Sequence, residues 1–298
     1  MIMNKISELK KSGDFVILAH NYQIPEIQDI ADYTGDSLEL CRISQDVDAR
    51  YIVFCGVKFM AETAAILNPD KIVLIPDKTS LCPLAEMLPA ERIKKAKKEH
   101  PDAAVAVYVN TVAEAKAEAD IIFTSANGLK VVNSLEEDTV LFGPDKNIAW
   151  HVQNHTEKKI RPLPKFGNCR VHEHDITKKD ILELKEAHPK AVVLAHPECN
   201  PEVQKIADYL CSTSQMLEKA GQDNEEFIIG TEKEMCYRLK KEYPDKIFYP
   251  IEKAVCTNMK KHTLPKLYGV MKEKDNVVNV DPATARKARK AIERMLKL

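Results

Sequence analysis

Short runs of β-branched and other apolar residues recur along the chain, separated by stretches of roughly ten residues with a helical pattern. Such runs are typical of strands that are buried on both faces of a sheet. The alternation therefore predicts βαβ units, and hence parallel sheets covered by helices. The strands that it predicts span residues 15–18, 51–54, 72–75, 105–109, 139–142, 191–194 and 226–229.

The apolar pattern itself repeats. Cys82, Cys169 and Cys256 are 87 residues apart, and each lies 26 residues after a glycine that ends an apolar run. Self-similarity at a fixed period indicates copies of one structural unit. The three cysteines should therefore occupy equivalent positions in three like domains, and a pseudo-threefold arrangement would bring them together. The three glycines are Gly56, Gly143 and Gly230.

The first half of each unit repeats as well. Residues 18–33 align with residues 194–209 without a gap, whereas the middle copy at 107–120 aligns only if two residues have been lost. We therefore predict an α/β fold of three homologous three-layer αβα domains with parallel sheets, in pseudo-threefold arrangement around a central active site. Their expected bounds are 1–86, 87–173 and 174–260, followed by a C-terminal helical extension at 261–298.

Charge and composition indicate which class of molecule the protein binds. The 298 residues carry a formal net charge of −1, with 44 basic and 45 acidic residues mixed along the chain. No basic face indicates nucleic acid and no polybasic stretch indicates a membrane, so a small molecule is the expected partner. Neither a spanning apolar run nor a signal peptide is recognisable, which predicts a cytoplasmic protein. In that reducing compartment the eight cysteines favour metal binding, catalysis or core packing over disulfides.

The repeated cysteines are candidate metal ligands. Three thiolates on a pseudo-threefold axis suit an iron–sulfur cluster in which the fourth iron keeps an open position. Zinc with three cysteines and water is the alternative, but structural zinc usually takes closely spaced ligand pairs. An open iron is a Lewis acid that helps to expel hydroxide as water, so dehydration is the expected chemistry. The other five cysteines lack counterparts and are expected in the core: Cys41, Cys55, Cys199, Cys211 and Cys236.

Polar side chains follow the predicted strands at their carboxyl ends, where parallel sheets bind ligands. They are His20, Tyr22, Asn110, His196 and Glu198, with His172 three residues after the second cysteine. Because the three strand ends should converge, we expect the active site there. Glu198, partly dehydrated beside a metal, would be a reasonable base for removing a proton from carbon.

A further repeated set carries hydroxyl groups, each just before a predicted helix. The segments are Asp36-Ser37, Thr124-Ser125 and Ser212-Thr213-Ser214. Hydroxyl and backbone N–H groups at a helix start bind phosphate or carboxylate, although plain N-capping would explain any single segment. Three in equivalent places indicate a polyanionic substrate. The sequence has no Gly-x-Gly-x-x-Gly or Walker A motif, so a dinucleotide or ATP is not expected.

Several of these stretches together resemble the quinolinate synthase family, over about residues 10 to 270. They are residues 19–32, Gly35-Asp-Ser37, Tyr108-Val-Asn110, 124–127, His196-Pro-Glu-Cys199, Ser212-Thr213 and 254–260. The resemblance implies condensation of iminoaspartate with dihydroxyacetone phosphate to quinolinate, with loss of phosphate and two waters, in NAD biosynthesis. It also implies a [4Fe–4S] cluster with Cys82, Cys169 and Cys256 as ligands. Transient contact with the enzyme that supplies iminoaspartate is a further expectation.

The resemblance also implies roles for individual residues. The positions that match the family's substrate cavity are His20, Tyr22, Ser37, Tyr108, Asn110, Ser125, His172, His196, Glu198 and Thr213. Tyr22 and Glu198 are expected to transfer protons, and His20 and His196 to take part in catalysis and hold anionic groups. Asn168 departs from the family's pattern, in which histidine often precedes the second cysteine. An aconitase-type hydro-lyase and a non-enzymatic iron–sulfur scaffold remain alternatives.

Overall fold

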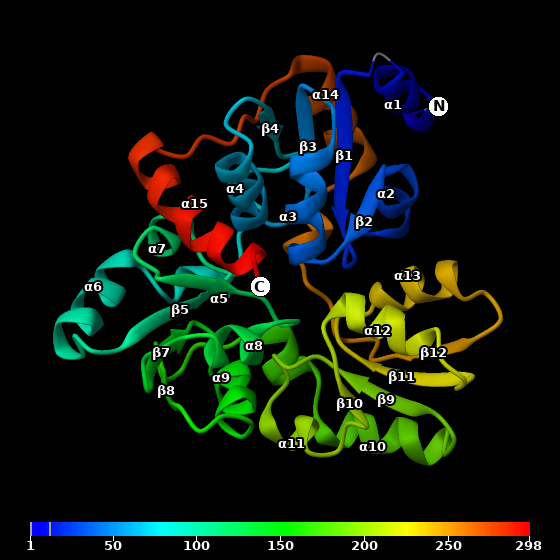
Figure 1. The fold of residues 1–298 in the computed structure, drawn as a ribbon. Coiled ribbons are helices and arrows are strands. Elements are labelled where there is room, and N and C mark those ends of the chain that lie inside the picture. Colours follow the sequence, from blue (N-terminus) through cyan, green and yellow to red (C-terminus); the bar gives the residue numbers. More distant parts are fainter. Residues whose placement is uncertain (1, 12) are drawn as a thin grey trace.

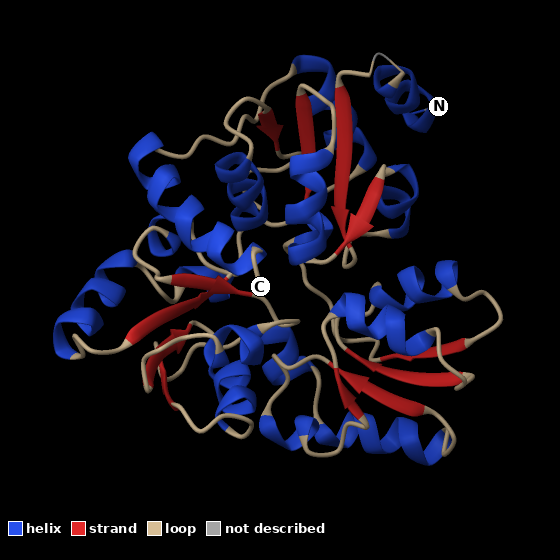
Figure 2. Ribbon diagram, viewed as in Figure 1, coloured by secondary structure: helices blue, strands red, loops and turns tan. Residues whose placement is uncertain are grey.

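The computed structural model describes residues 2–11 and 13–298. It contains three four-stranded sheets in which every pair of neighbouring strands is parallel. The strand order is the same in each sheet: β2-β1-β3-β4, β6-β5-β7-β8 and β10-β9-β11-β12. Helices cover the sheets, and the three lobes surround a common centre (Figures 1 and 2). The predicted fold class is confirmed.

All seven strands predicted from the apolar runs are present, and five further short strands complete the sheets. The first sheet has β1 (Phe15–His20), β2 (Tyr33–Gly35), β3 (Tyr51–Cys55) and β4 (Ile72–Leu74). The second has β5 (Ala104–Tyr108), β6 (Ile121–Phe123), β7 (Thr139–Gly143) and β8 (Lys159–Pro162). The third has β9 (Val192–Ala195), β10 (Tyr209–Leu210), β11 (Glu226–Gly230) and β12 (Ile247–Pro250). The five additional strands all lie at sheet edges, where short and partly polar segments suffice.

The first six helices along the chain are α1 (Ile2–Lys10), α2 (Pro25–Ile30), α3 (Ser37–Asp46), α4 (Lys58–Leu67), α5 (Pro83–Glu86) and α6 (Ala90–Glu99). Further along lie α7 (Ala113–Lys116), α8 (Gly128–Asn133), α9 (Lys146–Gln153), α10 (Lys178–Ala187), α11 (Pro201–Gln204), α12 (Thr213–Ala220) and α13 (Met235–Glu242). The C-terminal helices α14 (Leu264–Glu273) and α15 (Pro282–Leu296) fold back: α14 packs on α1, and α15 packs on α4, α7 and β6. Among the described residues, no helix combines the length and the apolar character needed to cross a lipid bilayer.

An aspartate fixes the same register in all three repeats. The carboxylates of Asp32, Asp120 and Asp208 each accept the backbone N–H of the residue fifteen positions earlier, at 2.8 Å in every case. These aspartates are 88 residues apart. The first half of the unit therefore repeats every 88 residues without a gap, and the predicted loss of two residues in the middle copy is wrong.

The corrected register changes which residues are equivalent. Tyr108, and not Asn110, occupies the position of His20 and His196 at the end of the first strand. Asn110 corresponds instead to Tyr22 and Glu198. The sequence misled because Asn110 resembles histidine in polarity, whereas Tyr108 is buried against the core at 4 % exposure.

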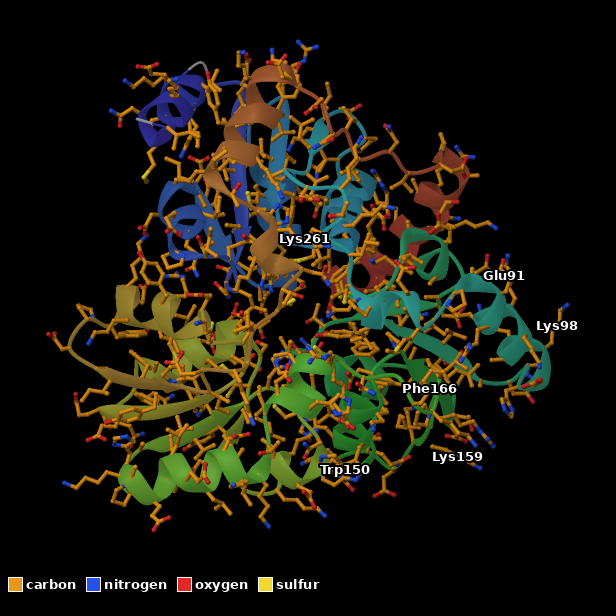
Figure 3. The ribbon with its side chains drawn as sticks, turned by 180° about the vertical axis from the view of Figure 1, so that it is seen from behind. Glu91, Lys98, Trp150, Lys159, Phe166 and Lys261 are labelled. Carbon is orange, nitrogen blue, oxygen red and sulfur yellow. The ribbon has the colours of Figure 1, made fainter. Side chains whose placement is uncertain are left out.

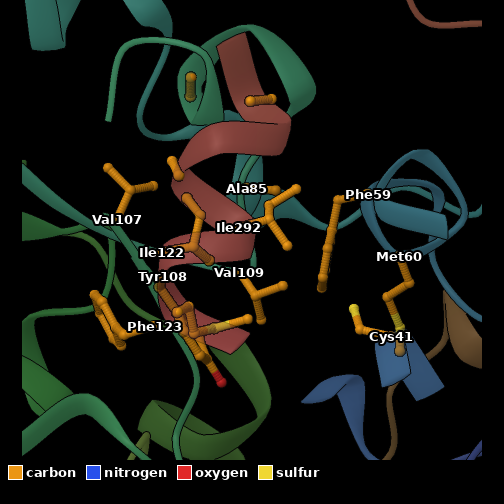
Figure 4. Close-up of a cluster of buried hydrophobic side chains, with 14 of the residues drawn as sticks. Cys41, Phe59, Met60, Ala85, Val107, Tyr108, Val109, Ile122, Phe123 and Ile292 are labelled. Carbon is orange, nitrogen blue, oxygen red and sulfur yellow. The ribbon is translucent and has the colours of Figure 1, made fainter. Parts of the chain in front are cut away.

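The hydrophobic core joins the first two repeats more closely than the third. One cluster of buried side chains runs from the first sheet through the second and includes Phe54, Phe123 and Ile292. Figure 4 shows Ile292 of α15 against Val109 and Ile122 of the second repeat. The third sheet has its own two clusters of buried side chains. Figure 3 shows side chains filling the space between the lobes, while charged residues such as Lys98 project outward.

Candidate active site

One pocket lies where the carboxyl ends of the three sheets meet, with about 1060 Å³ of atom-free space including its mouth. All thirteen residues predicted for the site line it: His20, Tyr22, Ser37, Cys82, Tyr108, Asn110, Ser125, Cys169, His172, His196, Glu198, Thr213 and Cys256. The structure thus brings together residues from all three repeats. Asn168 is not among the lining residues; its side-chain amide donates to the carbonyl of Phe166 at 2.9 Å.

Twelve of the thirteen residues fall into four sets of three equivalent positions. The sets are His20/Tyr108/His196, Tyr22/Asn110/Glu198 and Ser37/Ser125/Thr213, spaced by 88 residues, and Cys82/Cys169/Cys256, spaced by 87. We call them the strand-end, loop, hydroxyl and cysteine triplets. His172 stands alone, because its counterparts are Ala85 and Met259. The pocket is therefore pseudo-threefold in position, with one residue outside the symmetry.

The cysteine triplet has one local geometry. Each thiol accepts the backbone N–H of the residue three positions later, at the start of a tight turn or short helix. The three donors are Ala85, His172 and Met259. Burial nevertheless raises the pKa of all three thiols, to about 12 for Cys82, and nearby acidic groups add to the rise. Such thiols stay protonated until a metal replaces the proton, as metal ligands do.

None of the other five cysteines lines the pocket. Cys41, Cys55, Cys199 and Cys211 are buried, and Cys236 lies partly buried on α13. The expectation that these residues pack in the interior is confirmed for the four buried ones.

His172 links two of the predicted catalytic residues. It projects from a π-helical turn, Val171–Asp175, a distortion that is frequent at functional sites. Its Nδ1 lies 2.8 Å from Oε2 of Glu198 and 3.2 Å from Sγ of Cys169. Its Nε2 lies 2.8 Å from the hydroxyl of Thr231, which is 2.5 Å from the hydroxyl of Tyr22. A continuous hydrogen-bonded chain therefore joins Glu198 to Tyr22.

Burial and neighbouring groups set the protonation states of Glu198 and Tyr22, the two ends of this hydrogen-bonded chain. Burial alone would raise the pKa of Glu198, but the charge and hydrogen bond of His172 bring it to about 2. Glu198 is therefore a carboxylate at neutral pH. Burial raises the pKa of Tyr22 well above its ordinary value, and the Glu198 charge raises it further, so Tyr22 keeps its proton.

The two strand-end histidines share an orientation. Nδ1 of His20 accepts the backbone N–H of Tyr22 at 3.1 Å, and Nδ1 of His196 accepts that of Glu198 at 3.2 Å. Burial lowers the pKa of His20 to about 4 and that of His196 to about 3. Both are therefore neutral at pH 7 with the proton on Nε2, which is a donor for an anionic ligand.

The residues of the hydroxyl triplet are not the N-caps of the helices that follow them. Asp36 and Ser212, one residue earlier, provide the N-caps of α3 and α12. The hydroxyl of Thr213 accepts a hydrogen bond from the side chain of a neighbouring repeat. Within the described part of the chain, the hydroxyls of Ser37 and Ser125 have no hydrogen-bond partner. Capping therefore does not account for these two serines, which are available to a ligand.

Two acidic residues that hydrogen-bond to the backbone of the cysteines were not predicted from the sequence. Asp145 accepts the backbone N–H of Cys169, and Glu232 that of Cys256, both at 3.2 Å. Each acid lies 24 residues before its cysteine, so the 87-residue period could have revealed them. Burial raises the pKa of both carboxyl groups. Lys260 lies 2.8 Å from Oε1 of Glu232, and it donates to the carbonyl of Tyr22 at 2.7 Å, which no local pattern signals.

Comparisons with known proteins agree with this geometry. The family described as "Quinolinate synthetase A protein" matches residues 4–297. The chain is 52% identical over 299 residues to the quinolinate synthase of Methanothermobacter thermautotrophicus, covering 100% of this chain and 98% of the relative. It is 52% identical over 298 residues to the quinolinate synthase of Pyrococcus horikoshii, covering 100% and 99%. A quinolinate synthase of Dehalococcoides mccartyi is 52% identical over 300 residues, covering 100% and 98%. The chain is an enzyme that belongs to the quinolinate synthetase A protein family.

Proposed function

We propose that this enzyme condenses iminoaspartate with dihydroxyacetone phosphate to form quinolinate, with loss of phosphate and two waters, as a step of NAD biosynthesis. Family membership supports the reaction type. The observation that carries the proposal is the convergence of four residue triplets and His172 in one pocket. That pocket combines soft metal ligands, a carboxylate, neutral imidazoles and hydroxyl groups, which an anionic substrate undergoing dehydration requires.

The residues present fit a [4Fe–4S] cluster held by Cys82, Cys169 and Cys256. The three thiols line the same pocket, and each receives a backbone N–H of the kind that stabilises cluster sulfur. Among the residues that the structure describes, no fourth cysteine lines the pocket, which would leave one iron without a cysteine ligand. When bound, such a cluster supplies a Lewis acid that assists the departure of hydroxide.

The chain's own side chains would hold the substrates. Ser37, Ser125 and Thr213 offer hydroxyl donors, while the Nε2–H groups of His20 and His196 offer neutral donors to carboxylate or phosphate. Tyr108 and Asn110 complete the wall from the middle repeat. Neutral donors in a buried pocket bind an anion strongly, because few water molecules compete for it.

Proton transfer would fall to Tyr22 and Glu198. Glu198 is ionised, and the approach of a second anion would raise its low pKa and make it a stronger base. Tyr22 keeps its proton and can donate it. Thr231 and His172 would return protons between the two, because their hydrogen bonds already connect them.

Anaerobic purification followed by two measurements tests the proposal. Iron and sulfide analysis should find about four of each per chain, as a [4Fe–4S] cluster requires. Iminoaspartate with dihydroxyacetone phosphate should then yield quinolinate, detected chromatographically, and release phosphate. Zinc in place of iron would contradict the cofactor. Dehydration of a phosphate-free hydroxy acid without quinolinate formation would point to an aconitase-type hydro-lyase, and no turnover at all to a scaffold.

A further inference from the structure

Three buried residues outside the pocket occupy a fifth set of equivalent positions. Gln28, Lys116 and Gln204 are 88 residues apart, and their exposed fractions are 3 %, 0 % and 5 %. They lie on the short helices α2, α7 and α11, which follow the first strand of each repeat. None of them lines the pocket. We call them the anchor residues.

Each anchor residue donates to the backbone carbonyl five positions earlier. Gln28 donates to Gln23 at 2.8 Å, Lys116 to Thr111 at 2.5 Å, and Gln204 to Cys199 at 2.8 Å. The same acceptor position is therefore used in all three repeats, although the middle repeat has an ammonium group where the others have an amide.

These carbonyls belong to the loops that carry the loop triplet. Gln28 also donates to the carbonyl of Asn21 at 3.0 Å, so its two acceptors bracket Tyr22. Gln204 also donates to the carbonyl of Pro197 at 2.9 Å, and its acceptors bracket Glu198. In the middle repeat the acceptor Thr111 directly follows Asn110. The anchor residues thus hydrogen-bond to the backbone directly beside Tyr22, Asn110 and Glu198.

The anchor residues also reach into the neighbouring repeat. Gln28 lies 3.4 Å from the carbonyl of Glu234 in the third repeat, and Gln204 lies 3.2 Å from the carbonyl of Asn147 in the second. The Lys116 ammonium lies 5.2 Å from the ring centroid of Phe59 in the first. The contacts run from first to third, third to second and second to first, so they close a ring around the pseudo-threefold centre.

The chemistry of the recess explains why an amide and an ammonium both fit. Around Gln28 and Gln204, three carbonyl oxygens face a single side-chain nitrogen. An amide offers two protons to such a recess and an ammonium offers three. A carboxylate would be repelled by these oxygens, and a hydrocarbon would leave them without a donor.

We propose that Gln28, Lys116 and Gln204 are positioning residues, which set the places of Tyr22, Asn110 and Glu198 through the backbone and keep each loop in register with the next repeat. This inference rests on the proposed function where it concerns turnover. The inference extends the proposed function to the anchor residues, which do not line the pocket.

Lys116 offers the sharpest test, because Lys116→Met keeps the length of the side chain and removes the donor. The substitution also removes a charge partner of the buried Glu62 and leaves the Thr111 carbonyl without its donor, so it should lower stability. We expect the variant to fold and keep its cluster content with a lowered thermal midpoint, while kcat/KM for quinolinate formation falls at least about tenfold because Asn110 is misplaced. Lys116→Gln, which installs the amide of the other two repeats, should recover activity to within about threefold. Gln153→Leu removes a comparable side chain–carbonyl bond on α9, remote from the pocket, and should leave activity unchanged.

A second measurement is independent of the substrate. Hydrogen–deuterium exchange of the resting enzyme should be at least about tenfold faster at residues 108–112 in Lys116→Met, and should return toward the wild-type rate in Lys116→Gln. Unchanged exchange there would overturn the proposal whatever reaction the enzyme catalyses. Wild-type turnover in Lys116→Met, or equal impairment of the Gln and Met variants, would also overturn it. Failure of the wild-type enzyme to form quinolinate would instead contradict the proposed function.

Discussion

Two triplets in the same pocket differ in how far they keep the symmetry of the fold. Cysteine occupies all three positions at 82, 169 and 256, whereas the loop triplet holds Tyr22, Asn110 and Glu198. Both triplets occupy positions that are equivalent under the repeat. A cluster whose irons are nearly equivalent needs identical ligands, but a substrate without threefold symmetry needs different groups on each side. The comparison fits the proposal that the cysteine triplet holds the cofactor and the loop triplet contacts the substrate.

His172 strengthens this contrast, because it belongs to neither symmetric set. It contacts both Cys169 of the cysteine triplet and Glu198 of the loop triplet. Its counterparts, Ala85 and Met259, cannot exchange protons. The second repeat therefore contributes a titratable side chain that contacts both triplets, and this side chain has no equivalent in the other two repeats.

The largest effect should come from breaking the cysteine triplet. Serine at Cys82, Cys169 or Cys256 should each abolish the intact four-iron cluster and with it turnover, because any one of the three is an indispensable ligand. Cys236→Ser is the matched control, since Cys236 is partly buried but lies outside the pocket. Iron and sulfide analysis with the visible absorption spectrum provides the measurement. Normal cluster content in any of the first three variants would remove that cysteine from the ligand set.

The loop triplet should respond differently. Glu198→Gln gives this position an amide, as at Asn110, and removes its basicity while keeping its shape. Turnover should fall by at least about 100-fold, with cluster content unchanged and substrate still bound. Glu202→Gln, on the exposed side of α11, should have no such effect. An unchanged kcat in Glu198→Gln would show that another group moves the proton.

The link between Tyr22 and His172 should matter less. Thr231→Val keeps the side chain's shape and deletes the hydroxyl that hydrogen-bonds to both residues. Because the two hydrogen bonds contribute about 1 kcal/mol each, we expect a loss of kcat of about thirtyfold with an intact cluster. Steady-state kinetics provides the measurement. Equal activity of variant and wild type would mean that protons do not pass through Thr231.

The last effect is one on stability and not on turnover, and it concerns the strand-end triplet. The two histidines of this triplet can take up a proton in acid, whereas Tyr108 cannot. The pKa of His20 is lowered to about 4 by burial, below the ordinary 6.5 that it regains on unfolding. The free energy of unfolding is therefore fully retained above pH 6.5 and falls as the pH drops toward 4. Between pH 7 and 5 the loss should be about 2 kcal/mol for this histidine. Urea unfolding of metal-free protein should show that His20→Asn loses about 2 kcal/mol less than wild type. An identical loss would contradict a neutral buried His20.

The sequence revealed the symmetric features better than the asymmetric ones. The 87-residue spacing of the cysteines is visible in the sequence alone, and the strands that are buried on both faces could be predicted from their apolar runs. The register of the middle repeat was misjudged because one polar residue, Asn110, was matched to His20. Thr231 was missed because its partners Tyr22 and His172 lie in the other two repeats, and Lys260 because its bond to the Tyr22 carbonyl crosses to the first repeat. The division into 1–86, 87–173, 174–260 and 261–298 stays a prediction, as does contact with the enzyme that supplies iminoaspartate.

The proposed cluster would have one iron without a cysteine ligand, where the substrate would bind. Mössbauer spectroscopy of the isotopically enriched enzyme tests this iron most directly. Quinolinate carries a ring nitrogen beside a carboxylate, which together can chelate one metal ion. The account predicts that added quinolinate changes the parameters of one iron in four and leaves the other three nearly as they were. If quinolinate competes with substrate while all four iron signals stay fixed, the cluster is closed or structural, and the assignment of Lewis-acid chemistry to this pocket is wrong.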